Sequence, residues 1–408
     1  MLPLRLTAYT VTSALGAGLT AHRDALRHMR SGIVRKAWET VEPMCLGEVE
    51  GVDEVVLRSD LLNYDCRNNR LAQLALEQDG FIAAANTAIA QYGATRIGLF
   101  LGTSTSGILT SEIAYRHRET TSDTTSGIPS GVTGGALPAN YRYRETHNAF
   151  SVSDFVRKFL KLEGPAAVIS TACSSSAKVF ATAHRLIALG LIDAAIVGGV
   201  DSLCLTTLYG FSSLQLVSSN PCKPFDANRD GISAGEGGAF VLLERADKFN
   251  HGDILLTGIG ETSDAHHMSS PHPEGLGARN AMLAALNTAA LKPADIDYIN
   301  LHGTATPSND AAEDAAVIKV FGTDTPSSST KGYTGHTLGA AGGIEAVICA
   351  IALHDGFIPG GVGTEHIDER LHCNYIRQTV AQPLRHVLSN SFGFGGSNCS
   401  LIFSRVPT

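Results

Sequence analysis

Four predicted strands in this chain each run directly into a loop of glycine, serine or threonine residues. RIGLFL (96–101) continues into GTSTSG, AAVIS (166–170) into TACSSS, DYINL (297–301) into HGTATPSND, and LSN (388–390) into SFGFGGSN. Because strands alternate with helical patterns here, the sequence predicts an α/β fold. Open sheets bind their ligands at the carboxyl ends of their strands, so we expect the functional residues in these loops.

The spacing of apolar residues supports a helix after two of these loops. Small and apolar residues recur at steps of three and four after Cys173, and apolar residues follow the i, i+3, i+4, i+7 pattern after Gly343. This period indicates helices with one buried face. The runs 191–201 and 237–244 are continuous and apolar, as expected for strands that are covered on both faces.

A series of strand, loop, helix and strand occurs twice along the chain. The first copy occupies about residues 1–250 and the second about residues 251–408. The shared order predicts two related α/β halves, although the sequence identity between them is too low to prove a duplication. Residues 102–150 are the least regular, and we expect them to carry loops near the site or a subunit contact.

Composition and charge exclude several classes of protein. A chain of 408 residues with 44% hydrophobic and 17% charged residues can bury a large core in one big domain or two ordinary ones. The net charge of −8 argues against a nucleic-acid partner, which needs a concentrated basic surface. We expect no membrane partner and a cytoplasmic protein, since the chain has neither a run of 18 apolar residues nor the pattern of a secretory signal.

Three potential reactive patterns lack the context that they need. The eight cysteines form no CxxC pair and no close spacing with histidine, so neither disulfides nor a zinc site are expected. The histidines of HHMSSPH (266–272) fit no standard metal spacing. GISAG (231–235) precedes a predicted strand, whereas the hydrolase nucleophile that such a motif can carry precedes a helix.

Cys173 is the strongest candidate nucleophile. It follows a strand and begins a helix, where unpaired N–H groups and the positive end of the helix dipole favour the thiolate. Its small neighbours leave room for a substrate carbonyl to approach the backbone. A buried structural thiol is the alternative interpretation when Cys173 is considered alone.

The second half of the chain offers partners for this sulfur. His302 ends the strand DYINL, and His336 precedes a glycine-rich helix start. Lys331 lies in the same loop as His336, and Glu345 on the following helix could form a charge pair with it. Single residues of these types are usually structural or solvent-exposed, but two histidines at strand-to-helix junctions indicate a catalytic site.

The turn NSFGFGGSN (390–398) has the features of a tight backbone site. Three glycines permit unusual φ values, and the turn exposes a run of N–H groups that can stabilise a negatively charged oxygen. A simple glycine-rich hairpin is the alternative interpretation.

Taken together, TACSSS, HGTATPSND, KGYTGHTLGAAGG and NSFGFGGSN resemble the β-ketoacyl-acyl-carrier-protein synthases of the elongating type, in the thiolase-like superfamily. The resemblance covers nearly the whole chain and includes 224–244 and 263–271. It implies the thiolase-like fold, in which duplicated α/β halves form five layers, α-β-α-β-α. It also implies a decarboxylative Claisen condensation, in which malonyl-acyl-carrier protein reacts with an enzyme-bound acyl group in fatty acid, polyene or polyketide elongation.

The resemblance assigns a catalytic role to five residues. Cys173, in the half 1–250, matches the acylated nucleophile. His302 and His336, in the half 251–408, match the pair that promotes decarboxylation of the malonyl group. Lys331 matches the active-site lysine of the family and Glu345 its carboxylate partner.

Four further residues match positions that contact the substrate. Phe394 matches the gating phenylalanine, whose N–H joins that of the nucleophile in an oxyanion hole. Thr304 and Thr306 match threonines that contact the pantetheine arm. Thr105 stands where fatty-acid enzymes often carry a residue that lines the acyl pocket.

The resemblance also implies the partners of the protein. Arg67, Arg70 and Lys223 occupy positions where the family carries basic residues that dock the acidic acyl carrier protein, although scattered surface charges would look the same. Members of the family are dimers, so we expect a homodimer or a heterodimer with a subunit like a chain-length factor. No metal or redox cofactor is expected, because the substrates are carried on the phosphopantetheine of the carrier protein.

Several related classes fit the residues less well. A thiolase would carry a second catalytic cysteine in the turn where Phe394 stands, an initiating synthase would lack the second histidine, and a chain-length factor would lack Cys173. Thr105 and the segment 120–150 differ from the housekeeping enzymes. A secondary-metabolite ketosynthase for aryl polyenes or type II polyketides, acting with a chain-length factor, therefore stays an alternative.

Overall fold

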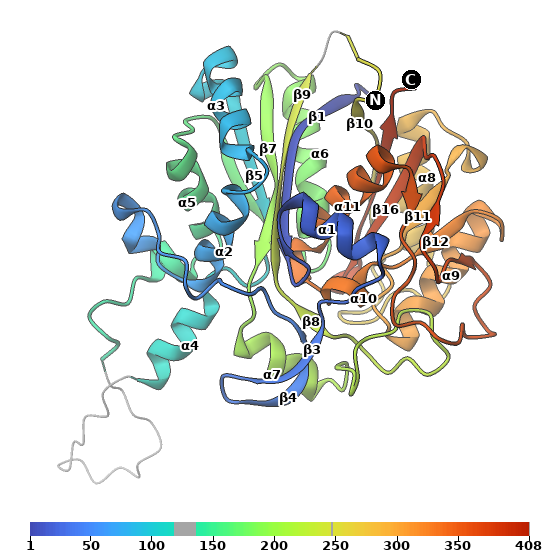
Figure 1. Cartoon of the computed structure of the whole chain (residues 1–408), viewed down its shortest axis with the longest axis horizontal. Helices are drawn as coiled ribbons and strands as arrows, with labels where there is room; N and C mark the ends of the chain where they lie inside the picture. Colours follow the sequence, from blue (N-terminus) through green and yellow to red (C-terminus); the bar gives the residue numbers. More distant parts are fainter. Residues whose placement is uncertain (118–135, 246–247, 408) are drawn as a thin grey trace.

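Two sheets with the same strand order form the frame of the protein (Figure 1). The structure is a computed structural model and describes residues 1–117, 136–245 and 248–407. If the five main strands of each half are numbered 1 to 5 along the chain, both sheets have the strand order 3-2-4-5-1. The strands of the first sheet, in this order, are β6 (Ala166–Ile169), β5 (Ile97–Gly102), β7 (Ala194–Asp201), β9 (Gly237–Arg245) and β1 (Leu4–Ser13).

The second sheet repeats this order with the strands of the second half. They are β12 (Pro326–Ser328), β11 (Tyr298–Asn300), β16 (His386–Gly393), β17 (Ser397–Arg405) and β10 (Ile254–Ser263), with β14 (Asn374–Tyr375) beside β12. β1 and β10 pair only through Leu4 and Arg5, so the hydrogen bonding continues from one sheet to the other. The boundary expected near residue 250 lies between the end of β9 and the start of β10.

Helices cover both outer faces and fill the space between the sheets, which gives the five layers of the expected thiolase-like arrangement (Figure 1). The middle layer contains α6 (Ser175–Ala188) and α11 (Ala341–Asp355). The outer helices of the first half are α2 (Arg67–Leu76), α3 (Phe81–Tyr92) and α5 (Ser151–Leu160), and those of the second half are α8 (Leu276–Ala289) and α9 (Pro307–Phe321).

Smaller elements connect and cap these layers. The short helices are α1 (Gly18–Arg27), α4 (Ile108–Arg116), α7 (Leu205–Ser213) and α10 (Lys331–Thr334). The minor strands are β2 (Gly16–Ala17), β3 (Val34–Trp38), β4 (Val41–Gly47), β8 (Ala234–Gly235), β13 (Phe357–Ile358) and β15 (Val380–Ala381). α4 lies within the irregular region 102–150, and part of that region, like part of the segment 120–150, falls outside the described residues.

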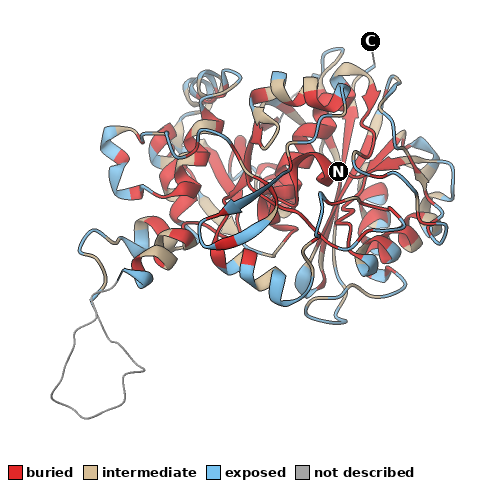
Figure 2. Cartoon of the chain, turned by 60° about the horizontal axis from the view of Figure 1, so that its bottom comes forward, coloured by how far each residue is buried: buried red, intermediate tan, exposed pale blue. Residues whose placement is uncertain are grey.

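Buried residues gather in the interior of the molecule, and they include most of α11 in the middle layer (Figure 2). All residues of α11 from Ala341 to Leu353 are buried. Among the described residues, one helical stretch, Leu338–Asp355, is long and apolar enough to cross a membrane, and 89% of it is buried inside the protein. Its composition therefore fits a core helix.

Two glycines allow the central helices to approach their neighbours. A side chain on Gly342 would lie 2.7 Å from the Cβ atom of Ala177 in α6. A side chain on Gly102, at the end of β5, would lie 2.2 Å from the backbone nitrogen of Ser176. The start of α6 is thus packed against the end of one strand and the start of α11. This packing fixes the position of the segment that carries Cys173.

Candidate active site

Cys173 lies on a tight turn between β6 and α6, two residues before the helix begins. The preceding Ala172 has a φ of +51°, a left-handed conformation that is strained for a residue with a side chain. Neighbouring hydroxyl groups hold the turn: Ser174 donates to the carbonyl of Thr171 (2.9 Å), and Ser175 accepts from the N–H of Thr171 (2.9 Å). The serine-rich sequence therefore fixes the backbone that presents the sulfur.

Two backbone N–H groups lie beside the sulfur and lower its pKa. One belongs to Cys173 itself and the other to Phe394, at the turn between β16 and β17. Gly393 brings this turn close, since a side chain there would lie 2.7 Å from the carbonyl oxygen of Thr171. The ring of Phe394 is 38% exposed and meets Phe211 edge to face, at 6.0 Å between centroids. The expected roles of Phe394 in an oxyanion hole and as a gate stay predictions.

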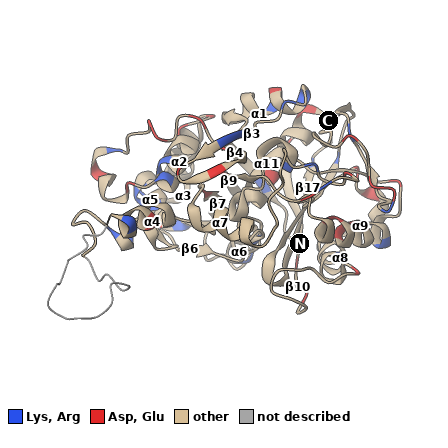
Figure 3. Ribbon diagram, turned by 90° about the horizontal axis from the view of Figure 1, so that it is seen from below, with Lys and Arg blue, Asp and Glu red and all other residues tan. Residues whose placement is uncertain are grey.

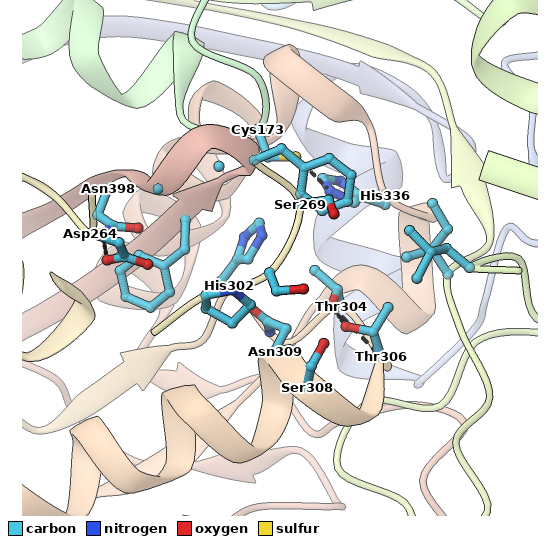
Figure 4. A pocket seen from close by; sticks show the side chains of 18 of the residues that line it. Cys173, Asp264, Ser269, His302, Thr304, Thr306, Ser308, Asn309, His336 and Asn398 are labelled. Carbon is cyan, nitrogen blue, oxygen red and sulfur yellow. Dashed lines mark hydrogen bonds between the residues drawn. The ribbon is translucent and has the colours of Figure 1, made fainter. Parts of the chain in front are cut away.

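His302 and His336 lie next to the sulfur, although more than 120 residues separate each of them from Cys173 in the sequence (Figure 4). Nε2 of His336 is 3.1 Å from Sγ of Cys173. The two imidazole rings are 5.4 Å apart and nearly perpendicular, at 84°. The sulfur of Cys173 and one ring nitrogen from each histidine all lie within 4.8 Å of one another. The structure therefore brings together the three residues on which the sequence hypothesis depends.

The hydrogen bonds of His336 define its tautomer. The backbone N–H of Leu338 donates to Nδ1 of His336 at 3.3 Å, so Nδ1 carries no proton in the neutral ring. Nε2 then carries the proton and donates toward the sulfur of Cys173. In this state His336 is a hydrogen-bond donor to the site and not a base.

Burial keeps both imidazoles neutral. Desolvation, with the positive charge of Lys331 as a second cause, lowers the pKa of His302 and of His336 well below the usual 6.5. Both rings can therefore donate a hydrogen bond at neutral pH without carrying a charge. This property suits the stabilisation of a developing negative charge on a substrate oxygen.

Burial raises the pKa of the Cys173 thiol, whereas the sequence predicted a lowered pKa. The helix N-terminus led us to expect a thiolate, but desolvation raises the pKa of the Cys173 thiol to about 11. The charge of Lys331 and the hydrogen bond from Phe394 lower this pKa but do not outweigh burial. The resting sulfur is therefore a thiol at neutral pH.

This raised pKa predicts a pH dependence of alkylation. The thiolate is the form that reacts, and below the pKa its fraction grows tenfold with each pH unit. We expect the rate constant for iodoacetamide alkylation of Cys173 to rise about tenfold per pH unit between about pH 7 and 9. Peptide mass spectrometry over a pH series measures this rate, and a plateau near pH 7 would contradict the raised pKa.

Lys331 and Glu345 form a buried ion pair behind the histidines. Nζ of Lys331 and Oε1 of Glu345 are 2.5 Å apart, and their side chains are 2% and 4% exposed. Lys331 belongs to α10 and Glu345 to the second turn of α11, so the pair joins the loop of His336 to the central helix. The predicted partnership is present. The ammonium group supplies the positive charge that helps to keep both imidazoles neutral.

Two buried carboxylates that were not predicted from the sequence hold the backbone around the site. Glu313 in α9 accepts from the backbone N–H groups of His302 and Gly303, both at 2.8 Å, and burial raises its pKa to about 7. Asp201, at the end of β7, accepts from the loop 103–105 and from the N–H of Ala340. The sequence did contain a sign of the role of Asp201, because an acidic residue at the end of an apolar strand is unusual.

A cavity leads from the sulfur to the surface. Its volume is about 630 Å³, which includes space open to solvent. The hydroxyl groups of Thr304 and Thr306 lie 2.9 Å apart on its wall, as expected for residues that contact a pantetheine arm. Thr105 does not line this cavity: it is fully buried, and its hydroxyl donates to Asp201 at 2.8 Å. Its expected place beside the acyl pocket stays a prediction.

The expected role of Arg67 in carrier docking does not agree with the structure. Its side chain is only 6% exposed and forms a bidentate ion pair with Glu236, at 2.6 and 2.9 Å. Arg70 is more exposed but pairs with Asp65, and Lys223 is half-buried near Asp226. Figure 3 shows basic and acidic residues interspersed over the ribbon. The sequence could not reveal that a carboxylate 169 positions away already neutralises Arg67.

The ion pair of Arg67 predicts an effect on stability. Replacing Arg67 with alanine leaves Glu236 buried without its cation, which costs roughly 3–5 kcal/mol of unfolding free energy. Replacing the exposed Arg70 with alanine is the matched control and is expected to cost less than about 1 kcal/mol. Urea denaturation of both variants tests this difference. Equal stabilities would show that Arg67 is not a structural cation.

Comparison with protein families identifies the chain. The N-terminal domain model of β-ketoacyl synthases matches residues 69–248, and the C-terminal domain model matches residues 254–365. The protein belongs to the β-ketoacyl synthase family. A 3-oxoacyl-[acyl-carrier-protein] synthase 2 of Staphylococcus aureus is 30% identical to this synthase over 405 residues, which cover 91% of this chain and 96% of the relative.

Other curated relatives match a shorter part of the synthase. The mitochondrial 3-oxoacyl-[acyl-carrier-protein] synthase of Arabidopsis thaliana is 38% identical over 263 residues, or 60% of this chain. The match covers 57% of the length of that relative, and the match to a Rhizobium meliloti synthase 2 covers 62%.

Solved structures match the whole synthase. A ketosynthase (ApeO) from Xenorhabdus doucetiae, in complex with its chain length factor (ApeC), has a TM-score of 0.86 and 38% identity, covering 99% of this chain and 98% of its own. A β-ketoacyl synthase from Burkholderia phymatum has a TM-score of 0.84 and 28% identity, with complete coverage of both chains. These matches confirm the thiolase-like fold.

The structure also shows where the other potentially reactive residues of the sequence lie. Ser233 of GISAG is buried and is followed by β8 and β9, so it lacks the helix of a hydrolase elbow. Cys399 is buried in β17 and does not line the cavity. His266 and His272 lie on an exposed loop with their rings 5.2 Å apart. The expectation that catalysis needs no metal stays a prediction.

Proposed function

We propose that this synthase condenses malonyl-acyl-carrier protein with an acyl group held on Cys173, with release of CO₂ and formation of β-ketoacyl-carrier protein. One observation supports this proposal above the others. A single sulfur lies beside two backbone N–H groups, and one nitrogen of each of two neutral imidazoles lies within 4.8 Å of it, at the end of an open cavity. Acyl transfer, decarboxylation and carbon–carbon bond formation can all take place at this point.

In the first step the sulfur of Cys173 attacks the thioester of an acyl-carrier protein. A carbon–sulfur bond forms to Cys173 and the bond to the pantetheine sulfur breaks, while the proton of the thiol ends on the pantetheine sulfur. The N–H groups of Cys173 and Phe394 stabilise the negative charge on the carbonyl oxygen in the tetrahedral intermediate. These two N–H groups lower the activation free energy of acyl transfer by roughly 3–4 kcal/mol.

In the second step malonyl-carrier protein loses CO₂. The electron pair of the broken carbon–carbon bond forms an enolate on the thioester, and its oxygen accepts hydrogen bonds from the Nε2–H group of His336 and from a ring N–H group of His302. The carbanion carbon then attacks the acyl carbonyl on Cys173. The carbon–sulfur bond to Cys173 breaks, the β-ketoacyl product stays on the carrier protein, and the sulfur takes up a proton from solvent.

The partners and location follow from the same proposal. The substrates arrive on the phosphopantetheine of an acyl carrier protein, and no metal or redox cofactor takes part in these steps. We infer a cytoplasmic dimer, either of two identical chains or with a subunit like a chain-length factor. The relatives include a 3-oxoacyl-[acyl-carrier-protein] synthase 2 and a ketosynthase in complex with its chain length factor, and they do not favour the alternative over the main proposal.

Reconstitution tests the proposed function. The purified protein is incubated with hexanoyl-carrier protein and malonyl-carrier protein from a bacterial type II system, and the carrier-bound products are analysed by mass spectrometry. We expect a β-ketooctanoyl-carrier protein that depends on both substrates. If the protein decarboxylates malonyl-carrier protein but forms no condensed product with hexanoyl, octanoyl or aromatic acyl groups, the condensation proposal is wrong.

A further inference from the structure

We propose that Cys173, His302 and His336 form an open three-ligand site for a soft divalent cation, with Zn²⁺ as the best match, and that its occupancy blocks the nucleophile. The inhibitory consequence rests on the proposed function, whereas the binding itself depends only on the geometry. Among the described residues, these three were the only group of cysteine, histidine and acidic side chains close enough to hold a metal ion.

The distances within this group suit zinc. Zinc lies about 2.3 Å from a cysteine sulfur and about 2.0–2.1 Å from a histidine nitrogen, which places tetrahedral ligand atoms roughly 3.5 Å apart. Nε2 of His336 and Sγ of Cys173 are 3.1 Å apart, and all three ligand atoms lie within 4.8 Å of one another. A rotation of the His302 ring that shortens the longest of these separations would close the coordination sphere.

His302 is free to make this rotation. Its buried Nδ1 has no hydrogen-bond partner among the described residues, so turning the ring breaks no bond at that atom. The ring contacts His336 and Phe392 edge to face, and its backbone is held by Glu313. A buried polar nitrogen without a partner favours a ligand that can use it.

The chemistry of the three groups also fits a cation of this class. Neutral imidazole and thiolate are the ligands that zinc prefers in proteins. Binding replaces the S–H bond of Cys173 with a sulfur–zinc bond and releases one proton to solvent. The cavity supplies the open fourth position for a water molecule or a pantetheine thiolate. The ammonium group of Lys331 opposes the cation, but Glu345 neutralises that charge at 2.5 Å.

Zinc on Cys173 blocks acylation, because the metal lowers the nucleophilicity of the sulfur and occupies the space that the thioester must enter. His336 would lose the Nε2–H group that the proposed enolate needs, since the metal occupies that nitrogen. The cation is therefore an inhibitor of this site and not a cofactor.

Metal titration of the purified full chain tests the proposal. Co²⁺ is the probe, because a cysteine thiolate bound to cobalt gives a charge-transfer absorption band, and Zn²⁺ is then added to displace it. We expect one equivalent per chain, with the band lost in Cys173→Ser and binding weakened by roughly 100-fold or more in His302→Ala. Bound Zn²⁺ is also expected to protect Cys173 from iodoacetamide, and chelation is expected to restore labelling.

The exposed histidine loop provides the matched control. His266 and His267 are solvent-exposed and could bind metal at the surface, so the double variant His266→Ala/His267→Ala should retain the thiolate–cobalt band and the protection of Cys173. Thermal unfolding confirms that each variant is folded. A cobalt site without the thiolate band, or equal affinity in Cys173→Ser, overturns the proposal. These readouts need no substrate, so they are independent of whether the condensation is observed.

Discussion

Replacing Cys173 with serine is expected to reduce the condensation rate by at least about 10⁴-fold. The side chain keeps nearly the same size, but its hydroxyl has a much higher pKa than a thiol. His336 donates to this position and does not act as a base, so nothing in the site activates a serine. Loss of a nucleophile from a comparable catalytic unit has cost up to about 10⁶-fold in rate. A steady-state assay of β-ketoacyl product measures the loss.

A second cysteine provides the control for this experiment. Cys204 is also buried but does not line the cavity, so Cys204→Ala is expected to keep most of the activity. Both variants should unfold at a temperature close to that of the parent protein. A folded Cys173→Ser protein that retains a tenth of the activity would contradict the role of the sulfur.

Replacing His302 with alanine is expected to slow decarboxylation of malonyl-carrier protein by roughly 10²–10³-fold, the usual effect of losing one oxyanion donor. Acyl transfer to Cys173 should change little, because its oxyanion donors are the backbone N–H groups of Cys173 and Phe394. Release of labelled CO₂ measures the first rate, and intact-protein mass spectrometry measures the second.

A conservative variant separates hydrogen bonding from packing. His302→Asn keeps an N–H donor and is expected to recover part of the lost decarboxylation rate, whereas His302→Ala cannot. If both variants slow acyl transfer as much as decarboxylation, His302 supports the structure of the site and is not the enolate donor.

Local patterns in the sequence were sufficient to predict the frame of the protein and the catalytic group. The loops after β6, β11 and β16 follow directly from strands with a clear apolar pattern, and the fold brings their ends to one cavity. His302, His336 and Cys173 could be proposed because each lies at such a junction. Lys331 and Glu345 were predictable because they lie close together in the sequence and face each other across one loop.

The remaining features depend on packing between distant segments. Arg67 is unavailable to a partner because Glu236 lies against it, and Thr105 is turned from the cavity because Asp201 accepts its hydroxyl. The pKa of Cys173 depends on how deeply the second half of the chain buries it, and not only on the helix that follows. No local pattern contains this information, since burial is a property of the folded chain.

Acylation without malonyl substrate tests the central claim most directly. The protein is incubated with acyl-carrier protein alone, digested, and mapped by mass spectrometry to find the acylated residue. We expect one acyl group per chain on the peptide that contains Cys173, and none in Cys173→Ser. An acyl group on any other residue, or an unmodified Cys173 in a protein that still forms the condensed product, would contradict it.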